Sequence, residues 1–249
     1  MDATTSCHDT ALVFWVRLKF ELAPRAFPIF RRAALDGLTE RRGFLMIALL
    51  TTSLQRPLDF ASPFSWDDAY LQDSHESDWL VDANDLRAPL LKALGHPSSA
   101  RWPLLELGSG TSPLAAQLHT AGFSHVTATD ASRTCVQTME RRYPQLHWKV
   151  ADARNTKLPS ASFGSIVDKG TLDALATGDG WDYEVRTIAT EVHRLLRPGG
   201  RWACVSLMPP SVWRPTVAAA AAFERIESEV LVDGPTTVHL HVGEREATA

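Results

Sequence analysis

Short apolar runs alternate with amphipathic segments from residue 102 onward. The apolar runs predict strands at residues 102–107, 125–130, 146–152, 163–170 and 197–207. Apolar residues recur at helical spacing in the segments between them, which predicts helices at residues 113–122, 132–143 and 182–196, the second with Ser132 as N-cap. Alternation of this kind predicts a parallel sheet covered by helices on both faces.

The C-terminal part follows a different pattern. Two strand-like runs, residues 225–232 and 236–245, are separated only by Asp233, Gly234 and Pro235. A turn this short predicts an antiparallel pair. The alanine run at residues 218–222 predicts the interior of a helix, since alanine is the best helix former.

Residues 1–60 differ from the remainder, because basic residues exceed acidic ones there while the rest of the chain is acidic. Their longest apolar stretch, GFLMIALL at residues 43–50, is too short for a membrane span, which needs about 20 apolar residues. Three interpretations stay open: an organelle transit segment, although its acids argue against it; a helical extension; or sequence upstream of the true start, with Met46 as initiator. We therefore divide the chain into an N-terminal extension, 1–60, and one domain, 61–246.

Composition narrows the partners and the compartment. The formal net charge of −4 argues against a nucleic-acid partner, since domains that bind nucleic acid are usually basic. Cys7, Cys135 and Cys204 are far apart and form no C-x-x-C, and the histidines form no zinc-ligand pattern. Thiols of this kind are typical of a reducing compartment. We expect a cytoplasmic location, or an organellar one if residues 1–60 are a transit segment.

Acidic side chains stand at the ends of four consecutive predicted strands: Glu106, Asp130, Asp152 and Asp168. Ligands of open α/β sheets bind at the carboxyl ends of the strands. After Glu106 the chain makes a Gly-x-Gly turn, and Asp130 lies 20 residues past its second glycine, where a ribose-binding carboxylate belongs. This spacing predicts a cofactor that contains a nucleoside.

The residues around the turn select among such cofactors. A dinucleotide site has a third glycine where this chain has Pro113, and Glu106 would repel a pyrophosphate. S-adenosylmethionine carries an amino group and a sulfonium but no phosphate. The acids therefore suit S-adenosylmethionine better than NAD.

Together these motifs resemble class I S-adenosylmethionine-dependent methyltransferases: E-x-G-x-G, the Asp ending strand two, AD after strand three, and LLRPGGR before strand five. The resemblance implies a doubly wound, mostly parallel seven-stranded sheet with a C-terminal antiparallel hairpin. DKGTLDAL at residues 168–175, WDDAY at 66–70 and SDWL at 77–80 are similar to the methyltransferase-like group that includes the elongation factor 1-alpha lysine methyltransferases.

The resemblance also implies a role for each site residue. The methionine end of the cofactor would be enclosed by Trp66, Tyr70 and Trp79, and the backbone of Gly108 and Gly110, with Glu106 beside them, would approach the cofactor. The ribose would be held by Asp130, Ala131 and Ser132, and the adenine would be framed by Asp152, Ala153 and Arg154, while Lys169 would lie beside the cofactor. Apart from the resemblance, the place of Asp168 and Asp173 at the end of strand four makes them the candidate catalytic residues, either of which would orient an acceptor amine.

Plainer interpretations stand beside these roles. The aromatic residues suit core packing, Lys169 suits a solvated loop, and Asp173 suits the start of a helix. Ala131 occupies a position where Tyr or Phe is common in the group, and residues 208–215 follow no pattern that would identify the target.

Four functions compete on this evidence. The leading one is N-methylation of a lysine side chain of a protein, by a metal-free displacement at an activated methyl group. A small-molecule methyltransferase is the first alternative, although an N-P-P-Y acceptor motif is absent. A catalytically silent cofactor-binding module is the second. An NAD-dependent reductase is disfavoured by Pro113 and by the lack of a Tyr-x-x-x-Lys pair.

Overall fold

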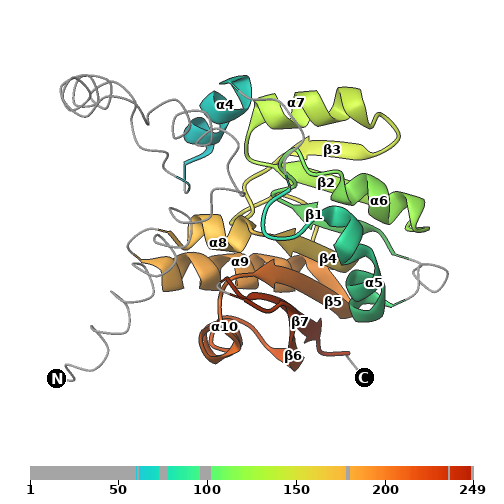
Figure 1. The fold of residues 1–249 in the computed structure, drawn as a ribbon. Coiled ribbons are helices and arrows are strands. Elements are labelled where there is room, and N and C mark those ends of the chain that lie inside the picture. Colours follow the sequence, from blue (N-terminus) through green and yellow to red (C-terminus); the bar gives the residue numbers. More distant parts are fainter. Residues whose placement is uncertain are drawn as a thin grey trace, which may run out of the picture.

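A single mixed sheet organises the structure, a computed structural model that describes residue 60 and residues 62–72, 78–95, 102–177, 180–234 and 236–247. Within this part of the chain the sheet has seven strands in the order β3-β2-β1-β4-β5-β7-β6 (Figure 1). They are β1 (Leu104–Leu107), β2 (Val126–Asp130), β3 (His147–Val150), β4 (Phe163–Lys169), β5 (Leu196–Ser206), β6 (Phe223–Val232) and β7 (Val238–Arg245).

The first five strands run parallel, and β7 inserts antiparallel between β5 and β6. This order confirms the doubly wound sheet and the C-terminal antiparallel pair expected from the sequence. The strand order reverses between β1 and β4, with β2 and β3 on one side and β5 on the other. Sheets of this kind bind ligands at such a reversal point, in the crevice outside the carboxyl ends of the strands.

Helices cover both faces of the sheet. They are α4 (Pro63–Gln72), α5 (Ala83–Leu94), α6 (Leu114–Thr120), α7 (Arg133–Arg142), α8 (Thr171–Leu175), α9 (Trp181–Leu195) and α10 (Pro210–Ala218). One core cluster joins the sheet to α5, α6 and α7, and a second joins it to α8, α9 and α10 (Figure 1). Successive side chains of a strand point to opposite faces of the sheet, as Leu104 and Leu105 of β1 do. The same strands therefore contribute side chains to both clusters.

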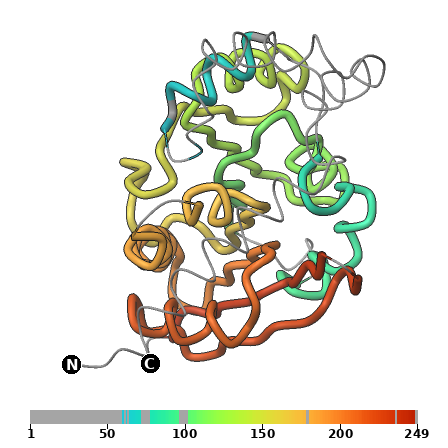
Figure 2. The backbone as a smooth tube through the Cα atoms, turned by 60° about the vertical axis from the view of Figure 1, so that its left-hand side comes forward, coloured from blue at the N-terminus to red at the C-terminus, as the bar shows by residue number. Residues whose placement is uncertain are grey.

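The helix α4 lies apart from these layers, against α7 at one end of the sheet (Figure 2). Through Asp67 it is hydrogen-bonded to Ser132 and Thr134, which follow more than 60 positions later in the chain. The extension predicted at residues 1–60 falls, apart from Phe60, outside the described residues. None of the described helices is both long and apolar enough to pass through a membrane.

The alanine run was predicted wrongly. The helix α10 ends at Ala218, and residues 219–222 form the turn that leads into β6. The backbone N–H groups of Ala219 and Ala221 close this turn on the carbonyls of Pro215 and Val217. Helix propensity is a weak preference, and here the need to reverse the chain toward the sheet edge overrides it.

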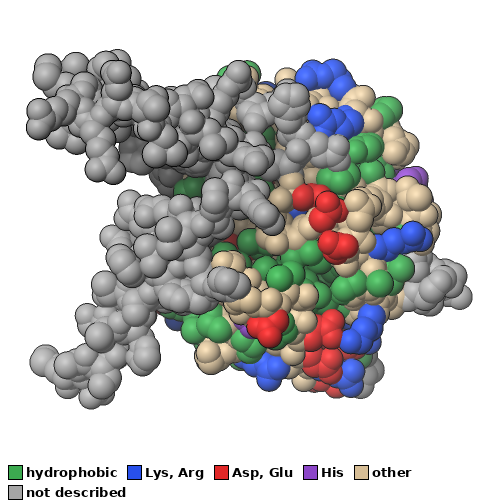
Figure 3. Space-filling model, in the orientation of Figure 1, with side chains coloured by type: hydrophobic (Ala, Val, Ile, Leu, Met, Phe, Trp, Pro, Cys, Tyr) green, Lys and Arg blue, Asp and Glu red, His purple; other side chains and the backbone are tan. Residues whose placement is uncertain are grey.

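On the face seen in Figure 3, acidic and basic side chains of the described residues lie close together. Among the described residues, Lys92 of α5 pairs with Glu229 of β6, and Arg201 of β5 pairs with Glu244 of β7. The first pair is exposed and the second partly exposed, and exposed pairs contribute little to stability.

Candidate functional site

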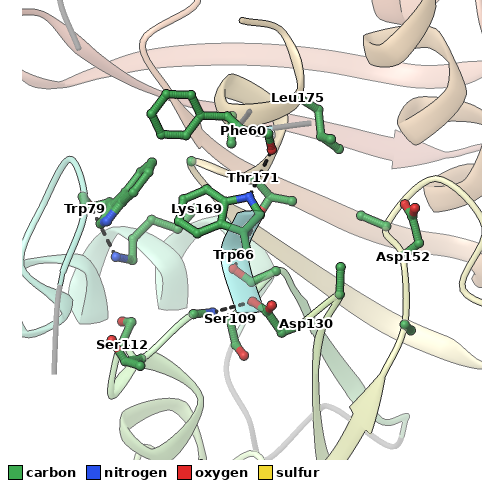
Figure 4. A pocket seen from close by; sticks show the side chains of 18 of the residues that line it. Phe60, Trp66, Trp79, Ser109, Ser112, Asp130, Asp152, Lys169, Thr171 and Leu175 are labelled. Carbon is green, nitrogen blue, oxygen red and sulfur yellow. Dashed lines mark hydrogen bonds between the residues drawn. The ribbon is translucent and has the colours of Figure 1, made fainter. Parts of the chain in front are cut away.

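The carboxyl ends of β1, β2 and β4 and the chain after β3 line one pocket (Figure 4). Of the residues named from the sequence, those lining it are Trp66, Tyr70, Trp79, Gly108, Gly110, Asp130, Ala131, Asp152, Ala153, Arg154 and Lys169. Glu106, Ser132, Asp168 and Asp173 are buried near the same strand ends but are not part of the pocket wall.

The turn after β1 is shaped by its two glycines. Gly108 and Gly110 have φ values of +59° and +52°, in the left-handed region that favours glycine. A Cβ at Gly108 would collide with the side chain of Thr171, the first residue of α8. The turn therefore brings the backbone to the pocket and packs directly against α8.

Asp130, at the end of β2, connects this turn to α7. Its carboxylate accepts hydrogen bonds from the backbone N–H groups of Gly110 and Ser132, both at 2.9 Å. Burial raises the pKa of Asp130 to about 6, and the two backbone hydrogen bonds oppose that rise. The carboxylate is thus ionised at neutral pH, and its remaining lone pairs face the pocket that it lines.

Ser132 acts as the predicted N-cap of α7, accepting a hydrogen bond from the backbone N–H of Cys135. Its own hydroxyl donates to Asp67 of α4, which also accepts from the backbone N–H of Thr134 at 3.0 Å. Burial alone raises the pKa of Asp67, but these hydrogen bonds outweigh it and hold the pKa below its ordinary value. Asp67 therefore fastens α4 to the positive end of α7.

A charged cluster closes the pocket on the β1 and β4 side. The side chain of Lys169 is 4% exposed, and its ammonium donates to Asp78 at 2.9 Å and to the carbonyl of Trp79 at 3.1 Å. Asp78 also accepts hydrogen bonds from the Ser112 hydroxyl and from the backbone N–H of Ala83. Lys169 is therefore a paired, buried cation rather than the solvated lysine considered from the sequence.

Glu106 lies behind this cluster at the end of β1. Burial raises its pKa to about 8, and the positive charge of Lys169 opposes the rise. Its Oε2 has no hydrogen-bond partner although the side chain is buried. An unpaired buried carboxyl oxygen of this kind is costly, and it suits a cationic or hydrogen-bond-donating ligand group.

Four aromatic residues form the wall opposite the strand ends: Phe60, Trp66, Tyr70 and Trp79. Ring centroids of Trp66 lie 5.7 Å from Tyr70 and 5.2 Å from Trp79, and the Trp66 indole N–H donates to the carbonyl of Phe60. Burial and the negative charge of Asp130 raise the pKa of Tyr70 well above its ordinary value, so its hydroxyl stays protonated. The wall presents aromatic, mainly apolar surface to the pocket.

Asp152 lies across the pocket from Trp79 (Figure 4). The Arg154 guanidinium donates to both of its carboxylate oxygens, with the shortest contact at 2.7 Å, and also reaches Glu184 of α9 at 3.5 Å. Although burial opposes it, hydrogen bonding from Arg154 holds the pKa of Asp152 below its ordinary value. Asp152 therefore contributes a rigid, ion-paired edge to the pocket.

The two candidate catalytic carboxyls face the protein interior. Asp168 accepts from the backbone N–H groups of Thr171 and Leu172 at 3.0 and 3.4 Å, which fixes the start of α8. Asp173 accepts from the Ser206 hydroxyl and the Leu207 backbone N–H at 3.0 and 2.9 Å. Burial raises the pKa of Asp168 to about 6 and that of Asp173 to about 7. Both join α8 to its neighbours, and the geometry does not bring either to the pocket wall.

Several residues of the site had not been named from the sequence: Phe60, Asp67, Asp78, Ser112 and Thr171. Asp67 and Asp78 stand inside the WDDAY and SDWL motifs. Their position next to the motif tryptophans was the feature of the sequence that could have identified them as site residues. Thr171 stands inside DKGTLDAL, directly after Gly170, and is the first residue of α8.

These residues fit a nucleoside with a cationic side chain. Asp130 supplies acceptors for sugar hydroxyls, and the unpartnered Oε2 of Glu106 suits a positively charged group. Carboxyls dominate the strand ends, and Asp67 already occupies the N-terminus of α7, which would otherwise attract a phosphate. The donor set agrees with S-adenosylmethionine and disagrees with a pyrophosphate.

Comparisons with known proteins agree with this description. Residues 104–200 match the family model described as a methyltransferase domain. EEF1A lysine methyltransferase 4 of Mus musculus is 37% identical over 158 residues, which cover 58% of this chain and 60% of the mouse protein. The eEF1A lysine and N-terminal methyltransferase of Danio rerio is 34% identical over 154 residues, 60% of this chain and 22% of that protein. The chain thus spans less than two thirds of the length of these relatives.

Solved structures share the fold at low sequence identity. A TehB-like SAM-dependent methyltransferase from Corynebacterium glutamicum has a TM-score of 0.53 and 14% identity, covering 74% of this chain and all of that one. The [4+2]-cyclase SpnF has a TM-score of 0.57 and 14% identity, covering 75% of this chain and 98% of that one. A methyltransferase and a cyclase therefore share this architecture, so the fold alone does not define the reaction.

Proposed function

We propose, on the premise that this chain carries a class I S-adenosylmethionine-dependent methyltransferase domain, that it N-methylates a lysine side chain of a protein substrate. The observation that carries the proposal is the pocket at the strand ends, where Gly108, Gly110 and Asp130 meet in the arrangement that the E-x-G-x-G motif implies. The names of the mouse and zebrafish relatives support the lysine acceptor. The domain is proposed to cover residues 61–246.

Asp130 would hold the cofactor ribose. Its carboxylate is ionised and fixed by two backbone hydrogen bonds, so it is oriented before a ligand arrives. Ala131 and Ser132 continue the chain past it, and the small Ala131 side chain leaves the pocket open where a larger residue would fill it. Asp152, Ala153 and Arg154 would frame the adenine.

Glu106 and Lys169 would receive the amino-acid end. Oε2 of Glu106 is a buried acceptor without a partner. Lys169 is a buried cation, and two of the three N–H donors of its ammonium are used by protein acceptors. An amino acid carries one positive and one negative group, which would match the ionised form of Glu106 and Lys169 in sign, and an ammonium beside Glu106 would favour that ionised form. The aromatic residues Trp66, Tyr70 and Trp79 would enclose this end.

The cofactor supplies a methyl group on a sulfonium that already makes a good leaving group. The protein's part is then to position the acceptor and exclude water. A lysine amine must be neutral to react, and an apolar wall lowers the pKa of an amine that enters it. Phe60, Trp79 and Leu175 contribute apolar surface of this kind to the pocket.

Asp168 and Asp173 are proposed to act on the acceptor indirectly. Their carboxyls are engaged by α8, Ser206 and Leu207, so they would fix the helix whose residues Ala174 and Leu175 line the pocket. We also propose a cytoplasmic location, which the free, buried thiols of Cys135 and Cys204 support.

The experiment is transfer of tritiated methyl from S-adenosylmethionine into a cell extract, followed by hydrolysis of the labelled protein to amino acids. We expect label in a discrete protein band, recovered as methylated lysine. Asp130→Ala should reduce it by about 100-fold or more, because a charged acceptor of hydrogen bonds is lost from the pocket. Asp233→Ala, in the exposed turn between β6 and β7, is the matched control and should retain activity.

Label found only in small molecules would refute the protein substrate and support the small-molecule alternative. Label recovered at a protein N-terminus would refute the lysine acceptor. Cofactor binding by calorimetry without transfer to any extract fraction would support the silent binding module.

A further inference from the structure

Thr171, the first residue of α8, joins this helix to the turn at Gly108. Its hydroxyl donates toward the carbonyls of Leu107 and Gly108, at 2.9 and 3.2 Å, and its backbone N–H donates to Asp168 at 3.0 Å. The residue is thus bonded to the end of β1 through its side chain and to the end of β4 through its backbone.

The packing of Thr171 against Gly108 is equally specific. A Cβ added at Gly108 would lie 2.6 Å from Cγ2 and 2.8 Å from Cβ of Thr171, and the three atoms nearest to it all belong to this threonine. Contacts this short are essentially never formed by real Cβ atoms. Each of the two residues therefore determines what the other position accepts: the glycine leaves room for the threonine, and the threonine fills it.

The middle of α8 is fastened by a second set of hydrogen bonds. Asp173 accepts hydrogen bonds from Ser206 and Leu207 at the end of β5, and Ala174 and Leu175 line the pocket. A five-residue helix has too few internal hydrogen bonds to hold its own position. Its position relative to the turn at Gly108 must therefore come from these lateral contacts.

We propose that Thr171 is a positioning residue for the methyl transfer: its hydroxyl and methyl group lock α8 to the Leu107–Gly108 turn, so that the acceptor side of the pocket is held in register with the cofactor side. The inference rests on the proposed function for its catalytic consequence. The steric coupling between Gly108 and Thr171 is independent of that function.

The first test compares Thr171→Val with Thr171→Ser and with Thr177→Val. Valine keeps the shape and removes the hydroxyl, whereas serine keeps the hydroxyl. Thr177 is the matched control, because its hydroxyl also donates to a backbone carbonyl, that of Ala174 at 2.8 Å, yet it does not line the pocket. The readouts are the dissociation constant for S-adenosylhomocysteine by calorimetry, kcat and KM for methyl transfer, and the melting temperature.

We expect Thr171→Val to weaken S-adenosylhomocysteine binding and to lower kcat by about tenfold each, the effect of one lost hydrogen bond of ordinary strength. Thr171→Ser and Thr177→Val should stay near the wild-type values. If Thr171→Val and Thr177→Val lower the melting temperature alike while leaving affinity and kcat unchanged, Thr171 is only structural and the proposal is overturned.

A double-mutant cycle tests the steric lock itself. Gly108→Ala alone should weaken binding by about a hundredfold, because the new Cβ meets Thr171 and the backbone is in the left-handed region. In the Gly108→Ala, Thr171→Gly double variant the obstructing side chain is gone, so its affinity should exceed the additive expectation by about tenfold. Additive effects on both affinity and melting temperature would overturn the lock.

Failure of the proposed function gives a different pattern. Wild-type protein that neither binds S-adenosylhomocysteine nor transfers methyl would refute the function and the catalytic role of Thr171 together. The melting temperatures of the cycle would still report whether Gly108 and Thr171 are coupled.

Discussion

The buried pair of Lys169 and Asp78 yields a quantitative prediction for Asp78→Asn. The substitution keeps the size of the side chain and one oxygen acceptor, but it removes the charge that faces the ammonium of Lys169, whose side chain is 4% exposed to solvent. Breaking a buried ion pair from one side commonly costs about 3–5 kcal/mol, because the remaining charge is left uncompensated.

Glu106 limits that cost in this protein. Burial raises its pKa to about 8, with the charge of Asp78 among the causes. When Asp78 is neutralised, Glu106 can lose its proton and compensate Lys169 instead. At pH 7 the release of a proton from a group with a pKa of about 8 costs about 1.4 kcal/mol. We therefore expect Asp78→Asn to lower the free energy of unfolding by about 2–3 kcal/mol at pH 7.

The pH dependence identifies this mechanism. Between pH 4.5, the ordinary pKa of Glu106, and about pH 8, its raised pKa, the folded protein keeps a proton that the unfolded chain has lost. The contribution of Glu106 to the free energy of unfolding of the wild type therefore falls as the pH rises through this range. In the variant that loss is absent, since the ionised Glu106 now pairs with Lys169. The destabilisation by Asp78→Asn should hence be about 2 kcal/mol smaller at pH 9 than at pH 6.

Urea unfolding of the full chain at the two pH values measures this difference. Asp68→Asn, an exposed neighbour on α4, serves as the control and should change stability by less than about 0.5 kcal/mol. Adding Lys169→Met to Asp78→Asn should restore part of the loss, because no buried charge remains. A destabilisation that is the same at both pH values, or a double variant less stable than Asp78→Asn, would refute the reasoning.

Two further predictions concern other buried carboxyls. Burial raises the pKa of Asp173 to about 7, so this carboxyl should lower wild-type stability by up to about 1.4 kcal/mol per pH unit between pH 4 and 7, in addition to the other buried carboxyls, and Asp173→Asn should reduce the total slope by that amount in thermal unfolding measured from pH 5 to 8; a slope equal to that of the wild type would show that Asp173 is ionised when folded. Asp67→Asn should destabilise the protein by about 1 kcal/mol in urea, since it removes a charged cap from α7, whereas Asp68→Asn should not; equal effects of the two substitutions would contradict the capping role.

The strand-end residues were predictable because a simple geometric rule governs them. Parallel strands end at one edge of a sheet, so the acid or glycine that follows each strand must gather there, as Gly108 and Asp130 do. Ser132 was predictable for a similar reason, since the N-cap is a local feature of the backbone.

The contacts of residues 60–82 were beyond such rules. Asp67 meets Ser132 across 65 positions, and Asp78 meets Lys169 across 91. The local pattern of apolar and polar residues does not predict which residues pair at such a separation in sequence. The orientation of the Asp173 side chain could not be predicted either, because the packing of a five-residue helix against its neighbours sets where its side chains point.

The insertion of β7 between β5 and β6 has a consequence for how the chain assembles. The strand β6 precedes β7 in the sequence, yet within the described sheet its ladder partner is β7, so β6 joins the sheet only through β7. The β6–β7 pairing is local, with Val232 opposite Val238, whereas Leu104 of β1 pairs with Ser165 of β4, so the hairpin can form independently of the five parallel strands. Completion of the sheet is then the docking of this hairpin on β5, and a chain shortened before Val238 would lose two strands rather than one while keeping every residue of the pocket wall.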